Sequence, residues 1–279
     1  MKRVTAAVCL LALALAGCKK QADTPATSQS SANAPTAALP APVVDTATAP
    51  VELKEVVETT PGYVVGITYT TQAAKYPGLA RELKRYADDA RAELVDAASG
   101  RTAKDNPSPY ELSLTFDDVI DSPELMAVSA DGSSYTGGAH AAPLIARFVW
   151  LPKQNKLLTA QELVPDKAGW TAISQYVREQ LHSALSQRID ADDLAPAVRA
   201  EQIETGGRMI DDGTGADPAN FAMFEPVRGA DGKLSGLKFV FAPYEVGPYS
   251  DGTQTVEVPA SVLLPHLAPA YRGMFLGGV

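Results

Sequence analysis

Alternation of apolar and polar residues predicts most of the strands of this protein. Residues 110–116 read Tyr-Glu-Leu-Ser-Leu-Thr-Phe, so Leu112 and Leu114 face one side of a half-buried strand. Residues 63–69 are rich in β-branched and aromatic side chains, which is typical of strands. An Asp-Gly pair at 231–232 predicts the turn of a hairpin. The other strands are expected at 51–57, 124–129, 144–150, 221–227, 237–242 and 253–258.

Two long segments, residues 77–98 and 167–188, carry apolar residues at the spacing of three and four that a helix requires. The two apolar stripes are Leu79, Leu83, Tyr86, Ala90 and Leu94 in the first segment, and Trp170, Ile173, Val177, Leu181 and Leu185 in the second. Residues 190–215 are polar and interrupted, which predicts a short helix followed by a Gly-rich loop. A helical tail is expected after residue 258.

The order of these elements predicts the fold class. Strands in adjacent groups, with long helices inserted, indicate an α+β fold in which two long amphipathic helices pack on an antiparallel sheet. We expect one domain at 51–279, with an N-terminal half at 51–150 and a C-terminal half at 151–279. A domain of about 230 residues buries more than two thirds of its unfolded surface, so it can fold on its own core.

The N-terminus has the pattern of an export signal. Lys2 and Arg3 precede an uncharged, mostly apolar stretch at 4–15. As a helix, this stretch would span about 18 Å, well short of the ~30 Å hydrocarbon core, so it favours a cleaved signal over a membrane span. Residues 15–18 read Leu-Ala-Gly-Cys. This motif resembles the lipobox of bacterial lipoproteins, and an ordinary secretory signal that contains a cysteine is the alternative.

The lipobox resemblance implies a signal peptide at 1–17 and a lipid on Cys18. In lipoproteins, the cysteine thiol takes a diacylglycerol and the freed amine receives a further acyl chain such as palmitate. Several chains give stable membrane anchoring. Position 19 is lysine, whereas aspartate there commonly retains lipoproteins at the inner membrane. The expected location is therefore the cell envelope, at the outer membrane and facing the periplasm.

Residues 18–50 differ in composition from the rest of the chain. They consist mostly of Ala, Pro, Thr and Ser and contain no aromatic residue. Such a segment cannot bury enough apolar surface to offset the entropy of ordering. We predict a disordered linker whose ends lie ~30 Å apart and hold the domain away from the membrane.

The sequence contains few of the residues and motifs that are typical of known catalytic sites. Of the two cysteines, Cys9 leaves with the signal and Cys18 takes the lipid, so no thiol remains for catalysis or metal binding. The serine-hydrolase elbow, the P-loop and the dinucleotide Gly fingerprint are absent. His140, His182 and His266 are the three histidines, and no two lie within five residues of each other. We therefore expect no cofactor, no metal site and no enzymatic activity.

Two segments stand out as candidate binding sites. Residues 135–140 contain two adjacent glycines, which permit positive φ and can form a polar nest of backbone amides, followed by a histidine that can donate to a partner. Residues 241–249 place two tyrosines beside a carboxylate, a composition suited to recognition. A simple turn in the first segment and local packing in the second are the structural alternatives. The ligand-binding candidates are Tyr135, Thr136, Gly137, Gly138, His140, Tyr244, Glu245 and Tyr249.

The order of these segments resembles the RsiV-type extracytoplasmic domain. The resemblance rests on Tyr-Thr-Gly-Gly-Ala-His at 135–140, Leu-Leu-Thr-Ala-Gln-Glu-Leu-Val at 157–164 and Phe-Ala-Pro-Tyr-Glu-Val-Gly-Pro-Tyr at 241–249, and it spans roughly 52–267. That domain is the outer part of a lysozyme-sensing anti-sigma factor and also accompanies a deacetylase domain in PdaC-type cell-wall enzymes. Here a lipoprotein signal replaces the sigma-binding and membrane-spanning parts, and the deacetylase partner is missing. The resemblance therefore implies recognition without transmembrane signalling or deacetylation.

The charge of the chain bears on its partner. The formal net charge is −9 and the isoelectric point is about 4.9. We expect no nucleic-acid partner, because phosphate binding needs a basic surface. A cationic protein such as lysozyme would be attracted.

Three functional hypotheses follow. The first is an envelope binding module for a lysozyme-like protein or peptidoglycan. The second is a hydrolase of envelope polymers that uses Glu245 or Asp251 with His140. The third is a structural or assembly lipoprotein with no small ligand.

Overall fold

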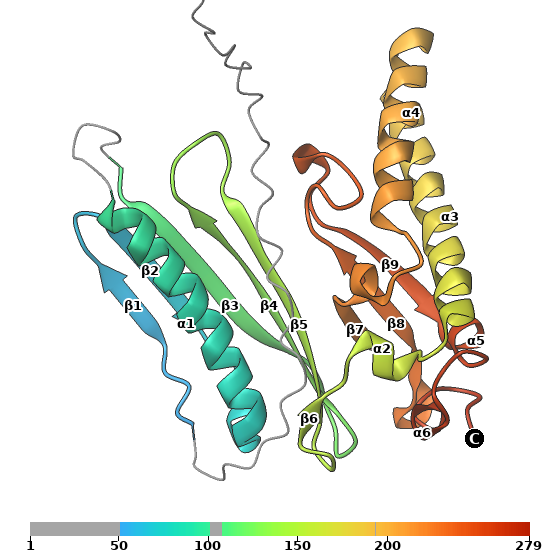
Figure 1. Ribbon diagram of the computed structural model, residues 1–279, viewed down its shortest axis with the longest axis horizontal. Coiled ribbons are helices and arrows are strands. Elements are labelled where there is room, and N and C mark those ends of the chain that lie inside the picture. The colour runs from blue at the N-terminus through green and yellow to red at the C-terminus, as the bar shows by residue number, and fades with distance from the viewer. Residues whose placement is uncertain (1–50, 101–107, 193) are drawn as a thin grey trace, which may run out of the picture. The chain divides into compact units, whose positions relative to one another are not determined.

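The computed structural model describes residues 51–100, 108–192 and 194–279 (Figure 1). The predicted signal peptide at 1–17, the lipidation site Cys18 and the predicted linker at 18–50 lie outside the described residues. Among the helices that are described, none combines the length and the apolar composition that a membrane crossing requires.

A six-stranded sheet forms the first part of the domain. Its strand order follows the sequence, and every neighbouring pair is antiparallel except β2 and β3, which are parallel. The parallel pair arises because a long helix, α1, connects the two strands and returns the chain to the same end of the sheet. The strands are β1 (Val56–Thr59), β2 (Tyr63–Thr68), β3 (Tyr110–Asp121), β4 (Met126–Tyr135), β5 (Ala142–Leu151) and β6 (Lys156–Leu157).

Helix α1 (Pro77–Ser99) covers one face of this sheet (Figure 1). Its apolar stripe is buried as the periodicity predicts, except that Tyr86 is half-buried, and it packs in one core with sheet residues such as Leu112, Phe116 and Phe148. The Arg91 guanidinium on α1 forms two hydrogen bonds of 2.8 Å with the Glu58 carboxylate on β1, and this lowers the pKa of that carboxyl. Both apolar burial and this ion pair therefore hold α1 against the sheet.

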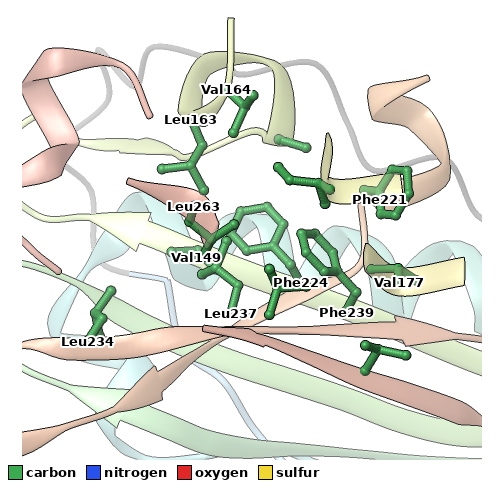
Figure 2. Close-up of a cluster of buried hydrophobic side chains, with 14 of the residues drawn as sticks. Val149, Leu163, Val164, Val177, Phe221, Phe224, Leu234, Leu237, Phe239 and Leu263 are labelled. Atoms are coloured by element: carbon green, nitrogen blue, oxygen red, sulfur yellow. The ribbon is translucent and has the colours of Figure 1, made fainter. Parts of the chain in front are cut away.

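A three-stranded antiparallel sheet, in the order β7-β8-β9, forms the second part. Its core contains Trp170 stacked on Phe221, with ring centroids 5.3 Å apart, and Phe221 meets Phe239 edge to face. Figure 2 shows Phe221, Phe224 and Phe239 grouped in this cluster. The elements of this part are α2 (Ala160–Leu163), α3 (Lys167–Ala191), α4 (Pro196–Gly213), β7 (Phe224–Arg228), β8 (Leu234–Phe241), β9 (Gln254–Pro259), α5 (Ala260–Leu263) and α6 (Pro269–Arg272). The described residues also form the 3₁₀ helices η1 (Gln72–Lys75), η2 (Pro218–Phe221), η3 (Ala230–Gly232) and η4 (Tyr249–Asp251).

The predicted α+β class is confirmed, and the structure refines its arrangement. The strands form two sheets rather than one, and each long predicted helix packs with a different sheet: α1 with the first and α3 with β9 of the second. The strand predicted at 221–227 begins only at Phe224, because residue 221 belongs to the 3₁₀ helix η2. Asp217 caps η2 by accepting a 2.9 Å hydrogen bond from the Ala219 amide. The strand predicted at 51–57 is shifted to Val56–Thr59.

The prediction of a short helix and a loop at 190–215 is wrong. Helix α4 runs for 18 residues and packs beside α3 (Figure 1). Two glycines inside α4 lower its intrinsic helix propensity, which explains the sequence-based error. They also allow the close packing: a Cβ on Gly206 would lie 2.9 Å from Leu185 Cδ2, and one on Gly207 would lie 3.2 Å from His182 Cε1. Tertiary packing thus stabilises a helix that the local sequence disfavours.

A buried ionic network joins the two sheets. Arg147 on β5 is 8% exposed and Glu225 on β7 is 6% exposed, and Arg147 Nε lies 2.5 Å from Glu225 Oε1. Lys238 Nζ on β8 lies 2.5 Å from the other carboxylate oxygen of Glu225. The Arg147 guanidinium also donates to Asp131 Oδ1, at 3.0 Å, and to the carbonyl oxygens of Ala130 and Ala146. Each buried charge therefore has an oppositely charged partner.

Candidate functional site

The tertiary structure brings the two predicted binding segments together. The imidazole of His140 stacks on the ring of Tyr249, with centroids 4.4 Å apart and an interplanar angle of 19°. The hydroxyl of Tyr249 donates a 3.2 Å hydrogen bond to the carbonyl oxygen of Ala141. The loop between β4 and β5 therefore contacts the loop between β8 and β9, across more than one hundred residues of sequence.

A third ring extends this contact into solvent. The ring of Tyr244 lies 5.7 Å from that of Tyr249, at an angle of 40°. Tyr244 is 56% exposed, which is unusual for a large aromatic side chain, and His140 is also exposed. We call His140, Tyr249 and Tyr244 the ring series. Two of its three members face solvent, and the half-buried Tyr249 connects them.

Tyr244 is held in an uncommon backbone conformation. Its φ is +76°, in the left-handed region that a bulky side chain rarely adopts and that costs about 1–3 kcal/mol. Such strain persists only where the surrounding structure over-determines it. The Tyr244 amide donates to Gly247 O at 2.9 Å, and the Glu245 amide donates to Ala242 O at 3.1 Å. Val246, 3% exposed, anchors the same turn in the core.

The carboxylate of Glu245 is used inside this turn. Its Oε2 accepts a 2.7 Å hydrogen bond from the backbone amide of Ala242. Burial raises the pKa of the Glu245 carboxyl, and the bond from Ala242 opposes that rise. The structure thus gives Glu245 the local role that the sequence left open as an alternative to ligand binding.

The raised pKa of Glu245 predicts a pH effect with a definite sign. The fold favours the protonated carboxyl, so the cost of ionising it is absent below the unfolded pKa, about 4.3, and complete above the folded pKa. Glu245→Gln keeps an acceptor for the Ala242 amide and removes this cost. Urea unfolding should therefore show Glu245→Gln gaining stability relative to the parent as pH rises from 4 to 7.

The matched variant Glu245→Ala isolates the hydrogen bond. It leaves the Ala242 amide without its acceptor and should be about 1–2 kcal/mol less stable than Glu245→Gln at both pH values. If the difference in free energy of unfolding between the parent and Glu245→Gln does not change with pH, burial does not raise the pKa of Glu245 as assigned.

The glycine pair of the first segment also has the expected backbone. Gly137 and Gly138 both have φ of +96°, which confirms the prediction of positive φ. The hydroxyl of Tyr135 donates to the carbonyl oxygen of Gly138 at 3.1 Å and so closes this turn. Thr136 and Gly138 are exposed. The pair positions the chain so that His140 reaches Tyr249.

The groups considered for hydrolysis have other partners. Asp251 Oδ2 accepts a 2.6 Å bond from Arg188 Nη2, and Glu245 is engaged by its own turn. His140, the third of these groups, stacks on the ring of Tyr249. His182, which was not a candidate for hydrolysis, has its Nε2 3.0 Å from Asp211 Oδ1. Within the part of the chain that the structure describes, no three His, Cys, Asp or Glu side chains gather as a metal site would require.

One residue that supports the site was not identified from the sequence. Gly213, the last residue of α4, lies directly behind the turn that carries Tyr244: a Cβ at this position would be 2.0 Å from the carbonyl oxygen of Glu245. The only sequence signal was a glycine near the end of a polar segment. Because α4 itself was not predicted, this contact could not be predicted either.

The fold and site define an α+β domain with an aromatic turn, held by hydrogen bonds, that follows the central strand β8 of its second sheet. Residues 233–261, which include β8, this turn and β9, match the family described as "Protein of unknown function (DUF3298)". No curated protein matches the sequence.

Two solved structures from that family are similar to this chain. The DUF3298 family protein from Pseudomonas aeruginosa PAO1 is 17% identical, with a TM-score of 0.46, over 80% of this chain and 93% of its own. The family member from Bacteroides fragilis is 14% identical, with a TM-score of 0.43, over 77% of this chain and 92% of its own.

Proposed function

We propose that this protein is a lipoprotein of the cell envelope whose folded domain binds an envelope partner through the ring series. The single observation that carries the proposal is Tyr244. It combines a solvent-facing ring, a left-handed backbone and a hydrogen-bonded turn. A rigid exposed tyrosine offers a large contact area at little entropic cost, and tyrosines are enriched among residues that dominate binding energy.

Charge favours a cationic protein of the lysozyme type as the partner. The chain has a net charge of −9. Exposed carboxylates line β3 on the face opposite α1, including Glu111 and Asp117, which have no ion pair among the described residues. Attraction between complementary charges increases the rate of encounter, and added salt weakens this attraction. The RsiV-type resemblance of residues 135–140 and 241–249 supports the same partner, and peptidoglycan is the other arm of the test.

Calorimetry of the chain without its signal and lipid, against lysozyme and against muropeptides, tests the binding proposal. We expect saturable binding of lysozyme that weakens with added salt, and a loss of tenfold or more in affinity for Tyr244→Ala. Val198→Ala is the matched control, because Val198 is 43% exposed on α4, outside the ring series, and its removal should leave affinity unchanged. Absence of binding to both probes, or full affinity in Tyr244→Ala, would overturn the proposal.

Anchoring at Cys18 is tested separately. Mass spectrometry of the native protein should find a diacylglycerol-modified, acylated cysteine at the new N-terminus, and fractionation should place it in the outer membrane. An unmodified sulfur would remove the envelope tether from the proposal, whatever the binding experiment shows.

A further inference from the structure

A second candidate site lies at the other end of β8. A cleft of about 400 Å³, within the range of small-molecule sites, opens where three segments meet. They are the turn between β3 and β4, the η3 turn before β8, and α6. The ring series follows the end of β8 at Phe241, and the cleft adjoins its start at Leu234, about 23 Å away at ~3.3 Å per residue. The two sites are therefore separate surfaces.

The floor of the cleft is apolar. Ile120, Leu125 and Leu234 line it and are no more than 5% exposed, and Met274 completes it. Leu125, Leu234 and Met274 also line a small void beneath, whose remaining walls are apolar residues such as Phe224 and Phe275. Apolar side chains thus continue below the floor, and an apolar group entering the cleft would leave water without separating a polar pair.

The rim of the cleft, as far as the structure describes the chain, includes an arginine that forms no ion pair. Arg228, at the end of β7, is exposed and has no carboxylate partner among the described residues. The other basic residue, Lys233, donates to the carbonyl oxygen of Gly273 and so fixes α6 against the turn. Of the two acidic residues at the rim, Glu124 lies 3.5 Å from Lys153, and Asp231 lies in the η3 turn. Arg228 is therefore the group that can receive an anion.

We propose that this cleft binds a small anionic amphiphile, with its carboxylate on the Arg228 guanidinium and its hydrocarbon part on Leu125, Leu234 and Met274. A guanidinium matches a carboxylate with two parallel hydrogen bonds, which explains the preference for this head group over an ammonium or a hydroxyl. The volume accommodates one short alkyl chain. The inference does not depend on the ring series or on its partner.

Titration with octanoate, octanol and octylamine, followed by amide chemical shifts of the chain lacking its signal and lipid, tests this site. Octanoate should saturate one site and shift amides around Lys233 and Gly273, whereas octanol and octylamine should bind at least fivefold more weakly. Arg228→Gln should weaken octanoate about tenfold. Ala270→Trp should abolish binding by filling the cleft, and because Ala270 is exposed this variant should fold.

Two controls separate this site from the proposed function. Arg208→Gln removes an exposed arginine of α4 that pairs with Glu204, and it should leave octanoate binding unchanged. Tyr244→Ala should also leave it unchanged, while Arg228→Gln should keep the parent affinity for lysozyme. Octanol binding as tightly as octanoate, or octanoate affinity unaffected by both Arg228→Gln and Ala270→Trp, would overturn the inference.

Discussion

Replacing Glu225 by alanine is expected to lower the free energy of unfolding by about 3–5 kcal/mol, because it leaves a buried arginine without its main counter-charge. Arg147 is 8% exposed, and its Nε lies 2.5 Å from the Glu225 carboxylate. The remaining partner, Asp131, is half-exposed and compensates poorly. Urea unfolding, followed by circular dichroism, measures the loss.

Two variants make the Glu225 result specific. Glu257 lies beside Lys238 in the β8–β9 register but is exposed, so Glu257→Ala should change stability by less than about 1 kcal/mol. The double replacement Arg147→Met with Glu225→Leu removes both charges and should recover most of the lost stability. A Glu225→Ala protein within 1 kcal/mol of the parent would show that the network does not hold the sheets together.

Gly213→Ala is expected to lower the free energy of unfolding by about 3 kcal/mol, although alanine favours a helix by about 1 kcal/mol over glycine. The added Cβ would lie 2.0 Å from the carbonyl oxygen of Glu245 and 2.8 Å from Val246 Cγ1. The first of these atoms belongs to the backbone, so either α4 or the turn that carries Tyr244 must move. Unfolding curves measure the loss, and amide shifts around Tyr244 report the displaced turn.

Gly100→Ala is the matched control for that replacement. Gly100 caps the end of α1 with φ of −79°, and a Cβ added there would have the carbonyl oxygen of Ala97 as its nearest neighbour, 3.8 Å away. With no clash, alanine should stabilise the protein by about 0.4–1 kcal/mol through the unfolded state. A gain at Gly213 equal to the gain at Gly100 would refute the close contact behind the turn.

The local sequence pattern was sufficient to predict an element where one of its faces is buried and the other is exposed to solvent. Helix α1 was predicted to within one residue, and strand β3 was predicted with the correct start, because Leu83 and Leu112 belong to periodic stripes that fit only one element each. Strand β3 continues to Asp121, beyond the predicted end at residue 116. The glycine pair at 137–138 was likewise predictable, since adjacent glycines permit the positive φ that is observed. These features depend on neighbours within about one turn or one strand.

Contacts between distant segments were not predictable in the same way. Helix α4 depends on Gly206 and Gly207 fitting against α3, and a sequence pattern registers those glycines only as helix breakers. The separation into two sheets depends on which strands exchange hydrogen bonds, which alternation does not encode. For the site, residue types indicated His140, Tyr244 and Tyr249, but not that Tyr249 lies between the other two or that Glu245 turns inward.

The sequence by itself therefore determined the α+β class, most strands, both long amphipathic helices and the two segments rich in recognition chemistry. Only the tertiary structure decided the two-sheet arrangement, the buried pairing of Arg147 with Glu225 and the meeting of those segments in the ring series. The physical reason is the separation along the chain of the residues that interact. Periodicity reports which side of an element is buried, whereas the identity of the neighbour that buries it is set by packing between residues far apart along the chain.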